Sequence, residues 1–473
     1  MSNQWELNVK DFGRIKEANI IVSPFMLFVG KNNSGKTYLM MLLWGILTEA
    51  RGLIRKHLSE HPGYHSFMNT LMQGLEQANE EQYTVFELNE AAQDELLNMF
   101  NDIVNENKEQ LLNKIFRFPV RAGSLKISRN NQIPFYSKYR KEVLPREDSI
   151  TLNTFAIKSG ITFQIDYNKK VIIRGFAPRD EQLFFNTFLE LCLVNMICSD
   201  FNVAALRTAS NAPLYFPASR TGFLQTYRAI IGSYFDKQLE VGSYVMEGSE
   251  NSLPDTSGTE LTLPVAQFLS RLQRHDPNEE TTAFYQDEIH FLNSELLDGR
   301  VEKGAGNQFR FKPGGGEQAY PLHVTSSLVA EVAPLSIFLT AKEDSKLWII
   351  EEVESHLHSE LQRRMVRFLF RLINKGKSIW MTTHSDNLAQ QINNLLAIAQ
   401  HKHKDKLLEK LNYTEQDIIK DLSIVNAYQF EVVNGITEVT HLPLTENGFV
   451  MDTFNDTLVK LVTETDLIQN FTE

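Results

Sequence analysis

The chain has 473 residues, of which 42% are hydrophobic and 22% are charged, a composition typical of a globular protein with two or three domains. Its formal net charge of -12 argues against nonspecific wrapping of nucleic acid, although a local basic surface stays compatible with it. No apolar run is long enough to cross a bilayer, so we expect a cytoplasmic protein without membrane contact. Cys192 and Cys198 lie in one apolar run, where they are expected to fill a core rather than form a disulfide.

Three strands and a helix are predicted at the start of the chain. Residues 5–11 and 15–22 alternate apolar and polar side chains around Phe12-Gly13, which is the pattern of a β-hairpin. Residues 25–29 are all apolar, as expected of a buried strand. A helical pattern follows over residues 38–47, so a short loop connects the buried strand to a helix.

That loop, residues 30–37, has the pattern GxxxxGKT. Its glycines permit a tight turn that brings backbone N–H groups close to phosphate oxygens, and the helix N-terminus adds partial positive charge. The lysine is expected to reach the β- and γ-phosphates, and the threonine hydroxyl can hold Mg²⁺. A glycine-rich turn without a ligand is the alternative, but the flanking strand and helix favour a nucleoside triphosphate site. The residues expected to bind the nucleotide are Gly30, Asn32, Asn33, Ser34, Gly35, Lys36 and Thr37.

The middle of the chain gives less specific signals, and no internal repeat or long heptad arm is visible. Its apolar spacing predicts a mainly helical stretch first, then strands, then helices again. The expected elements are helices over about 45–110 and 181–201, strands over 150–157, 161–175 and 214–216 with a polar tip ending at Arg220, an exposed loop at 246–262, helices over 264–297, and a strand pair flanking 313–316.

A basic segment within this region suggests a partner. Residues 114–146 contain nine Lys or Arg residues and one acidic residue, Glu142. Basic residues mixed with aromatic ones can follow a phosphate backbone and stack on bases, so contact with DNA or RNA is one interpretation. A solvated basic face, or a docking face for an acidic protein, is the other. The aromatic residues are Phe116, Phe118, Phe135, Tyr136 and Tyr139.

Two acidic residues follow a second apolar strand, residues 346–350. Glu351 is suited to coordinate Mg²⁺ through water, and Glu352 is suited to orient or deprotonate an attacking water. An amphipathic helix then leads to a third strand, residues 378–382, which His384 closely follows. Because a strand–helix–strand unit is right-handed and parallel, His384 is expected beside Glu352, where it can sense a γ-phosphate. An ordinary solvated strand end and a structural histidine are the alternatives.

The sequence LWIIEEVESHLH at 347–358, together with TTHS at 382–385, resembles the second half of an ABC-type ATPase head. The resemblance is to the structural-maintenance, RecF and OLD-like group known as AAA15 or AAA21 ATPases. Val353 and Ser359 stand where that family usually has proline, and neither change removes a catalytic group. The resemblance implies an α/β fold with ATP and Mg²⁺ as cofactors: an ABC-type P-loop head, with a mixed sheet and an antiparallel β subdomain, interrupted by a helical insertion.

The same resemblance implies a division of the chain. Residues 1–50 and 301–450 are expected to form the two parts of the head, residues 51–300 a helical and β insertion, and residues 451–473 a C-terminal helix. The ABC signature is placed at 323–327, ahead of a helix at 328–340. In the family, its serines contact the γ-phosphate bound to the opposite subunit, which implies a homodimer around ATP, alone or within a larger assembly. Ser326 and Ser327 can take this role, but Leu328 replaces the usual glycine and puts the backbone contact in doubt.

The tail predicts a further hairpin, because residues 426–433 and 437–444 flank Asn434-Gly435. A short helix is expected near 454–463. OLD-type nucleases carry a Toprim domain after the histidine strand, but the 89 residues that follow His384 contain no such set of acidic ligands. We interpret the histidine pairs at 356/358 and 401/403 as part of the ATPase motif and a solvated turn, rather than as metal sites.

Three functions stay open from the sequence. The favoured one is an ATPase that acts as a sensor or switch for a separate effector, expected to be a nuclease, as in bacterial antiphage systems such as Septu and PARIS. The second is a RecF-like ATPase of DNA repair or recombination. The third, a nucleotide-binding subunit of a transporter, is the weakest, because transporter heads normally carry LSGGQ and lack so large an insertion.

Overall fold

The computed structural model describes residues 5–66, 83–87, 90–129, 155–156, 162–165, 170–174, 212–218, 220–226, 261–304 and 308–451, with single positions at 69, 463, 464 and 466. Both cysteines and the predicted helix at 181–201 lie outside the described residues. The same holds for nearly all of the loop at 246–262 and of the helix at 454–463. Within the described residues, no helix combines the length and the apolar character that crossing a membrane requires.

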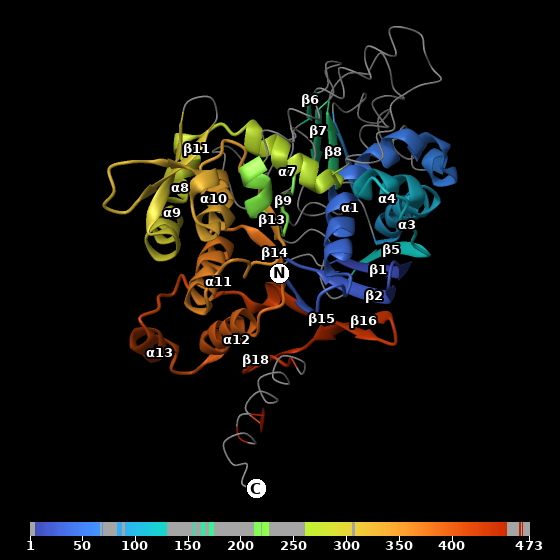
Figure 1. The fold of residues 1–473 in the computed structure, drawn as a ribbon. Coiled ribbons are helices and arrows are strands. Elements are labelled where there is room, and N and C mark those ends of the chain that lie inside the picture. Colours follow the sequence, from blue (N-terminus) through green and yellow to red (C-terminus); the bar gives the residue numbers. More distant parts are fainter. Residues whose placement is uncertain are drawn as a thin grey trace, which may run out of the picture.

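A nine-stranded mixed sheet forms the centre of the molecule (Figure 1). Its order is β5-β1-β2-β16-β15-β3-β14-β13-β9. The five strands from β15 to β9 are parallel, whereas β1 is antiparallel to both neighbours and β15–β16 form the predicted hairpin. The strands are β1 (Trp5–Phe12), β2 (Ile15–Val22), β3 (Phe25–Gly30), β5 (Ser124–Arg129), β9 (Leu214–Phe216), β13 (Leu347–Ile350), β14 (Ser378–Thr383), β15 (Val425–Val433) and β16 (Ile436–Leu442). The mixed α/β architecture predicted from the sequence is confirmed.

Helices cover both faces of this sheet and form two hydrophobic clusters. Met26 and Phe28 of β3 belong to the cluster built with α1 (Lys36–His57), α3 (Glu90–Glu106) and α4 (Lys108–Phe116). Phe25, Leu27 and Val29 belong to the other cluster, built with α10 (Ser327–Leu339), α11 (Ser359–Asn374) and α12 (Asp386–Gln400). Both faces of β3 are therefore buried, which explains why its sequence is continuously apolar rather than alternating.

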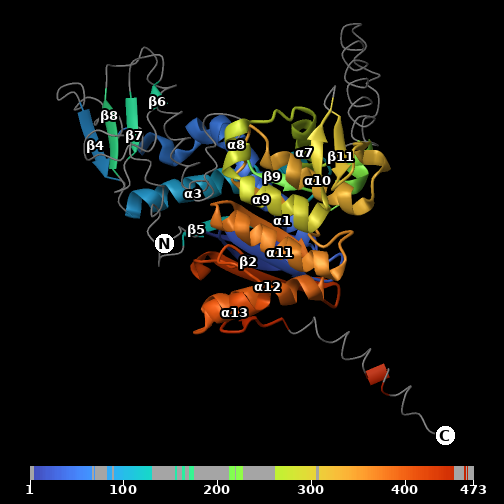
Figure 2. The ribbon, with the colours of Figure 1, turned by 90° about the vertical axis from the view of Figure 1, so that its left-hand side faces the viewer.

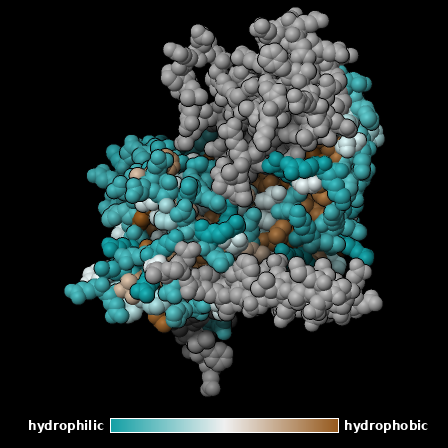
Figure 3. Space-filling view, turned by 90° about the horizontal axis from the view of Figure 1, so that it is seen from above, coloured by the Kyte–Doolittle hydropathy of each residue, from teal (hydrophilic) through white to brown (hydrophobic). Residues whose placement is uncertain are grey.

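The remaining elements surround this core. In the view of Figure 3, the described surface is mainly hydrophilic, and its larger hydrophobic patches lie toward the middle of the molecule. The predicted helices at 264–297 and the strand pair around 313–316 are confirmed. These elements are α7 (Leu263–Gln273), α8 (Glu279–Phe284), α9 (Gln286–Phe291), a π-helical turn (Leu292–Leu297), β10 (Gly299–Lys303), β11 (Phe309–Pro313), β12 (Tyr320–Pro321), α13 (Lys404–Leu411), β17 (Leu444–Thr445), β18 (Gly448–Phe449), and 3-10 turns at Leu58–Glu60, Leu322–Val324 and Leu422–Ile424.

Two strands occupy positions where the sequence did not predict them. β4 (Tyr83–Glu87) lies in a stretch predicted to be helical, and that prediction is wrong there. It pairs with β8 (Lys170–Arg174) in a sheet that continues to β7 (Thr162–Ile165) and β6 (Phe155–Ala156) and stands apart from the central sheet (Figure 2). β5 joins the central sheet by pairing with β1. Both strands pair with strands that are distant in the sequence, and the local spacing of apolar residues does not indicate such pairing.

The N-terminal part of the basic segment packs against the head. Lys114 forms an ion pair with Glu49 at 2.6 Å. Phe116 is buried, and its ring stacks on Tyr38 with the centroids 5.1 Å apart and tilts against Phe12. Phe116 therefore cannot stack on a base, and that element of the nucleic-acid interpretation is wrong. Residues 130–146 lie outside the described part of the chain, so the rest of the interpretation stays a prediction.

Candidate active site

The loop after β3 runs directly into α1, as predicted. Gly30, Asn33 and Gly35 take backbone conformations with positive φ, at 143°, 59° and 90°. A Cβ atom on Gly30 would lie 2.2 Å from the carbonyl oxygen of Phe430 on β15, so no larger residue fits there. Gly35 is the N-cap of α1, and its left-handed conformation turns the chain into the helix. The glycines of the motif are thus required by the backbone geometry of the loop.

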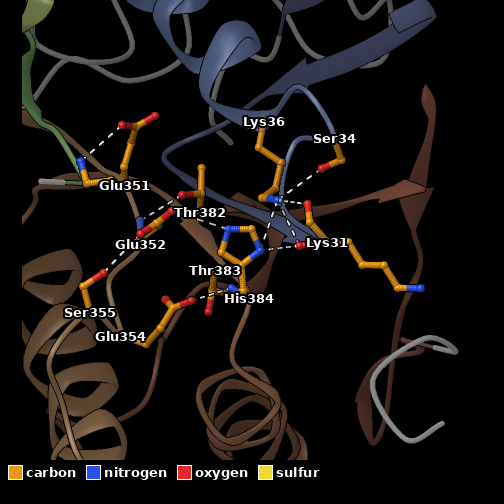
Figure 4. Close-up of polar contacts among 12 residues, drawn as sticks. Lys31, Ser34, Lys36, Glu351, Glu352, Glu354, Ser355, Thr382, Thr383 and His384 are labelled. Carbon is orange, nitrogen blue, oxygen red and sulfur yellow. Dashed lines mark hydrogen bonds and ion pairs between the residues drawn. The ribbon is translucent and has the colours of Figure 1, made fainter. Parts of the chain in front are cut away.

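Lys36 points back into the curve of this loop (Figure 4). Its Nζ donates to the carbonyl oxygens of Gly30 at 2.9 Å and Lys31 at 2.8 Å, and lies 3.1 Å from Ser34 Oγ. Burial lowers the pKa of Lys36 to about 8, against the opposing effect of the nearby carboxylates, led by Glu354. The cation is therefore held at the centre of the loop, and its charge is sensitive to its surroundings.

Three neighbouring strands bring the predicted catalytic groups to one edge of the sheet. β14 lies between β3 and β13 and is parallel to both, so the C-terminal ends of all three strands meet. His384 Nε2 lies 3.6 Å from Glu352 Oε1, and His384 Nδ1 lies 3.4 Å from Lys36 Nζ. The prediction that His384 lies beside Glu352 is confirmed.

His384 is fixed by contacts on both sides of its ring. Its Nδ1 lies 2.6 Å from the carbonyl oxygen of Gly30. Because a carbonyl can only accept, Nδ1 carries the proton in this bond. The backbone N–H of His384 donates to Glu354 Oε1 at 2.5 Å. The imidazole thus connects the phosphate loop to Glu352, and its Nε2 faces the carboxylate.

Glu352 lies in a strained turn. Its φ is 43°, a left-handed conformation that is uncommon for a residue other than glycine. The turn is held by a hydrogen bond from its N–H to Thr382 Oγ1 at 2.9 Å, and Ser355 Oγ donates to its Oε2 at 3.3 Å. Its proximity to His384 lowers the pKa of Glu352, which outweighs the effect of partial burial. The carboxylate is therefore ionised and 42% exposed, and it can orient a water molecule or accept its proton.

Glu351 is buried, unlike its neighbour. Its Oε2 accepts from the backbone N–H of Ala218 at 3.3 Å, whereas its Oε1 has no hydrogen-bond partner among the described residues. Burial raises the pKa of Glu351, and the hydroxyls of Thr37 and Tyr215 lie close enough to oppose that shift. A carboxylate oxygen with free bonding capacity beside a threonine hydroxyl is a set of hard oxygen ligands. Glu351 and Thr37 therefore fit Mg²⁺ and are the residues that would hold it.

Arg220 is a site residue that the sequence reasoning missed. Its side chain is buried, and its Nη1 donates to the carbonyl oxygens of Glu351 at 2.6 Å and Pro217 at 3.2 Å. Its Nη2 donates to the carbonyl oxygen of Glu352 at 3.3 Å and forms an ion pair with Glu331 of α10. The available signal was its position just after the apolar strand at 214–216, which β13 brings to the same sheet edge.

The signature serines lie at the start of α10. Both Ser326 and Ser327 are exposed, and Ser326 is the N-cap, whose Oγ accepts from the N–H of Val329 at 3.4 Å. Leu328, in place of the family glycine, is partly buried and packs against the hydrophobic cluster beneath. Within the described residues, neither serine forms a hydrogen bond with the phosphate loop. Their predicted contact with a nucleotide of the opposite subunit stays a prediction.

A phosphate loop after a parallel strand, with carboxylates and a histidine at the tips of adjacent strands, defines an ABC-type P-loop ATPase head. The chain belongs to the AAA ATPase domain family (AAA_15), whose sequence pattern matches residues 5–120 and 223–389. This match includes the loop, both glutamates and the histidine, so the family predicted from the sequence is confirmed.

Comparison with curated proteins finds no match. Among solved structures, the chain is similar to the SMC head domain from Thermotoga maritima (10% identity, TM-score 0.33, covering 94% of this chain and 100% of that chain). It is also similar to an SMC head bound to the C-winged helix domain of ScpA (10% identity, TM-score 0.34, 93% and 98%). A third is the Smc head domain with an extended coiled coil, bound to the C-terminal domain of ScpA, from Pyrococcus furiosus (11% identity, TM-score 0.36, 98% and 100%).

Proposed function

We propose that the protein hydrolyses ATP slowly and works as a nucleotide-controlled switch. The observation that carries this proposal is the convergence of Lys36, Glu352 and His384 at the ends of β3, β13 and β14. Lys36 binds the β- and γ-phosphates, and Glu352 orients or deprotonates the attacking water. His384, held between the Gly30 carbonyl and Glu352, reports whether the γ-phosphate is present.

Mg²⁺ bound by Thr37 and Glu351 would neutralise charge that develops on the phosphate oxygens. The protein's own contribution is to hold these oxygen ligands in place. Arg220 and Ala218 fix the backbone and one carboxylate oxygen of Glu351, leaving the other oxygen free. These contacts support the proposed role of Glu351 as a metal ligand.

We propose that ATP is bound between two heads in a homodimer. Ser326 and Ser327 are exposed at the N-terminus of a 13-residue helix, where backbone N–H groups and the helix dipole favour an anion. The γ-phosphate of an ATP molecule bound by residues 30–37 of the partner head would be such an anion. Leu328 is used for packing, so the backbone contact there is weaker, which favours slow turnover.

The proposed dimer is tested by cross-linking. Lys31→Cys and Val324→Cys form the cysteine pair, because Lys31 is an exposed residue of the loop and Val324 is an exposed residue of the signature. The pair is placed in a background where Cys192 and Cys198 are serine. Disulfide formation between subunits should rise strongly with a nonhydrolysable ATP analogue. A control pair combines Lys31→Cys with Leu411→Cys on α13, which is also exposed. Equal cross-linking with and without nucleotide would count against the sandwich.

We further propose that the switch acts on a separate effector, a nuclease in antiphage defence. The resemblance to the ATPase subunits of Septu and PARIS supports this role. Glu352→Gln should trap the ATP-bound form and Lys36→Ala the empty form, so an effector should be retained by one variant and released by the other. Pull-down from a native host with both variants as bait, followed by a nuclease assay of the retained protein, tests this. If neither variant retains a nuclease but both change the tolerance of cells to DNA damage, the RecF-like repair function replaces it.

A further inference from the structure

The buried side chain of Arg220 contacts both the turn that carries Glu352 and the helix that carries the signature serines. In the proposed dimer, these two elements of one subunit face different ATP molecules. Arg220 lies in the helical residues 220–226, which come after β9 in the chain. Both Nη atoms of its guanidinium donate to the turn after β13, and Nη2 also forms the ion pair with Glu331 of α10. Because the guanidinium is planar, a single rotamer serves both contacts, so a shift of one element bears directly on the other.

The contacts at the turn after β13 fix the backbone rather than the side chains. Nη1 and Nη2 donate to the carbonyl oxygens of Glu351 at 2.6 Å and Glu352 at 3.3 Å. Glu352 has a φ of 43°, and such strain persists only where the surroundings hold it. Arg220 is one of these restraints, together with Thr382, whose Oγ1 accepts from the Glu352 N–H.

The contacts at α10 involve the first turns of the signature helix. Glu331 is buried and forms the ion pair with Arg220. Its Oε2 also accepts from the hydroxyl of Thr221 at 2.8 Å and from the Thr221 N–H at 3.3 Å. The Thr221 hydroxyl lies 3.4 Å from the carbonyl oxygen of Ser327. Arg220 and Thr221 are therefore bonded to the helix whose N-terminus carries the exposed serines.

We propose that Arg220 is a positioning residue that couples the start of α10 to the catalytic turn at Glu352. When a partner head engages Ser326 and Ser327, the helix start shifts or stiffens, and Glu331 and Arg220 transmit this to the turn. Hydrolysis is then enabled only in the assembled dimer. This inference rests on the proposed function, since it assumes that ATP is bound between two heads.

A purely structural role for this ion pair predicts a different outcome. Buried ion pairs often contribute little net stability, and removing one partner leaves an unpaired charge. If the ion pair has only a structural role, replacing Arg220 should lower the unfolding temperature. It should also change the hydrolysis rate of free heads and of disulfide-linked dimers by the same factor. The coupling role predicts that the response of hydrolysis to dimerisation is lost while ATP affinity is kept.

The first test compares Arg220→Lys with the parent protein in the Lys31→Cys/Val324→Cys background. Lysine keeps the charge but lacks the planar fork that bonds three carbonyl groups and a carboxylate together. In the parent, disulfide locking should raise ATP turnover and slow amide hydrogen exchange in peptides covering 350–355. In Arg220→Lys, cross-linking should proceed as before, but the effect of locking on turnover should fall about tenfold, within the range typical of coupling residues.

A milder variant keeps the test decisive if Arg220→Lys fails to fold. Thr221→Val removes the hydroxyl that bonds Glu331 and approaches Ser327, while the buried ion pair stays in place. It should reduce the effect of locking about threefold. Thr226→Val in the same segment is the matched control, because its hydroxyl bonds only the Gly222 carbonyl at 2.7 Å, as far as the described residues show. This control should respond to locking as the parent does.

The outcomes separate the two proposals. The coupling role is wrong if disulfide locking raises ATP turnover in the variants as much as in the parent. It is also wrong if locking does not raise turnover in the parent itself. In both cases the proposals of ATP binding and dimerisation are unaffected. If ATP does not promote cross-linking in the parent, the proposed sandwich fails first. If Arg220→Lys and Thr221→Val lose only thermal stability, the ion pair is structural.

Discussion

Strands β13 and β14 carry a charged cluster at each end, and the clusters differ in how completely their polar atoms are bonded. At the N-terminal end, Lys377 Nζ contacts Asp344 Oδ1 at 2.7 Å and the Ser345 carbonyl at 2.9 Å. Lys346 and the hydroxyl of Tyr285 both donate to the same Asp344 carboxylate. Each charge of this cluster therefore has an opposite charge in contact.

The C-terminal cluster is incompletely bonded. Glu351 Oε1 and Glu354 Oε2 are buried without a hydrogen-bond partner among the described residues, and Glu352 has a strained backbone. Buried polar atoms are normally paired, so such exceptions require an explanation. We therefore interpret the first cluster as one that stabilises the fold, and the second as one that retains bonding capacity and strain for a ligand. Changes in the two clusters should accordingly affect different properties.

The largest effect is expected on hydrolysis, from Glu352→Gln. Glutamine keeps the size of the side chain and its contact with Ser355 but removes the charge that we propose activates water. Turnover should fall by roughly 10² to 10⁴-fold, the usual scale for a lost general base, with ATP affinity nearly unchanged. Phosphate release and binding of a fluorescent ATP analogue measure the two quantities. A variant with wild-type turnover would move the role to Glu351 or Glu354.

The next largest effect is expected on stability, at the opposite end of the strands. Asp344→Asn leaves the buried Lys377 without its counter-ion, which should cost about 3 kcal/mol of unfolding free energy. Burial acts to raise the pKa of Asp344, but Lys377 and Lys346 outweigh it and lower the pKa. The ion pair with Lys377 therefore stabilises the protein at pH values above the pKa that Asp344 has in the unfolded chain. This stabilisation is lost as the pH falls through the lower pKa of Asp344 in the folded protein. Denaturant titrations should show the difference at pH 7, shrinking in acid, with unchanged ATP affinity at pH 7.

A smaller effect concerns the pH dependence of nucleotide affinity. The pKa of Lys36 is about 8, so its cation is present below that pH and lost above it. ATP affinity should therefore fall about tenfold between pH 7 and pH 9, following the protonated fraction. Lys36→Ala keeps Glu352, Glu354 and His384 in place, and it should bind more weakly with a flat profile over this range. Parallel profiles for both proteins would assign the dependence to another group.

The smallest effect should have the opposite sign to that of Asp344→Asn. Glu351→Gln removes a buried charge with an unbonded oxygen, so the free protein should gain about 1 kcal/mol of stability, as is common where function has kept a destabilising group. Added Mg²⁺ should no longer increase the stabilisation by ATP. Thermal unfolding with and without each ligand measures both effects. Loss of stability in the free protein would place Glu351 among the structural charges.

The parts of the site that follow from local sequence were predictable. Residues 25–37 specify strand, loop and helix through neighbours in the chain, and the order strand, helix, strand placed His384 beside Glu352. Arg220 was not found because its partners, Glu331 and the carbonyls after β13, come from segments more than 100 residues away. β4 and β5 were not predicted for the same reason, since each pairs with a strand distant in the sequence, and for β4 this pairing overrides the local helical spacing.

The position of β15 and β16 between β2 and β3 has a consequence for how the protein is made. The strands next to the phosphate loop are synthesised first, but the sheet between them closes only when β15 and β16 arrive. At about 5–20 residues per second, those strands leave the ribosome roughly 20–80 s after β3. Until then, the edge of β2 that pairs with β16 and the edge of β3 that pairs with β15 have no partner in the central sheet. Truncated translation products should therefore be unable to bind ATP and should depend on chaperones.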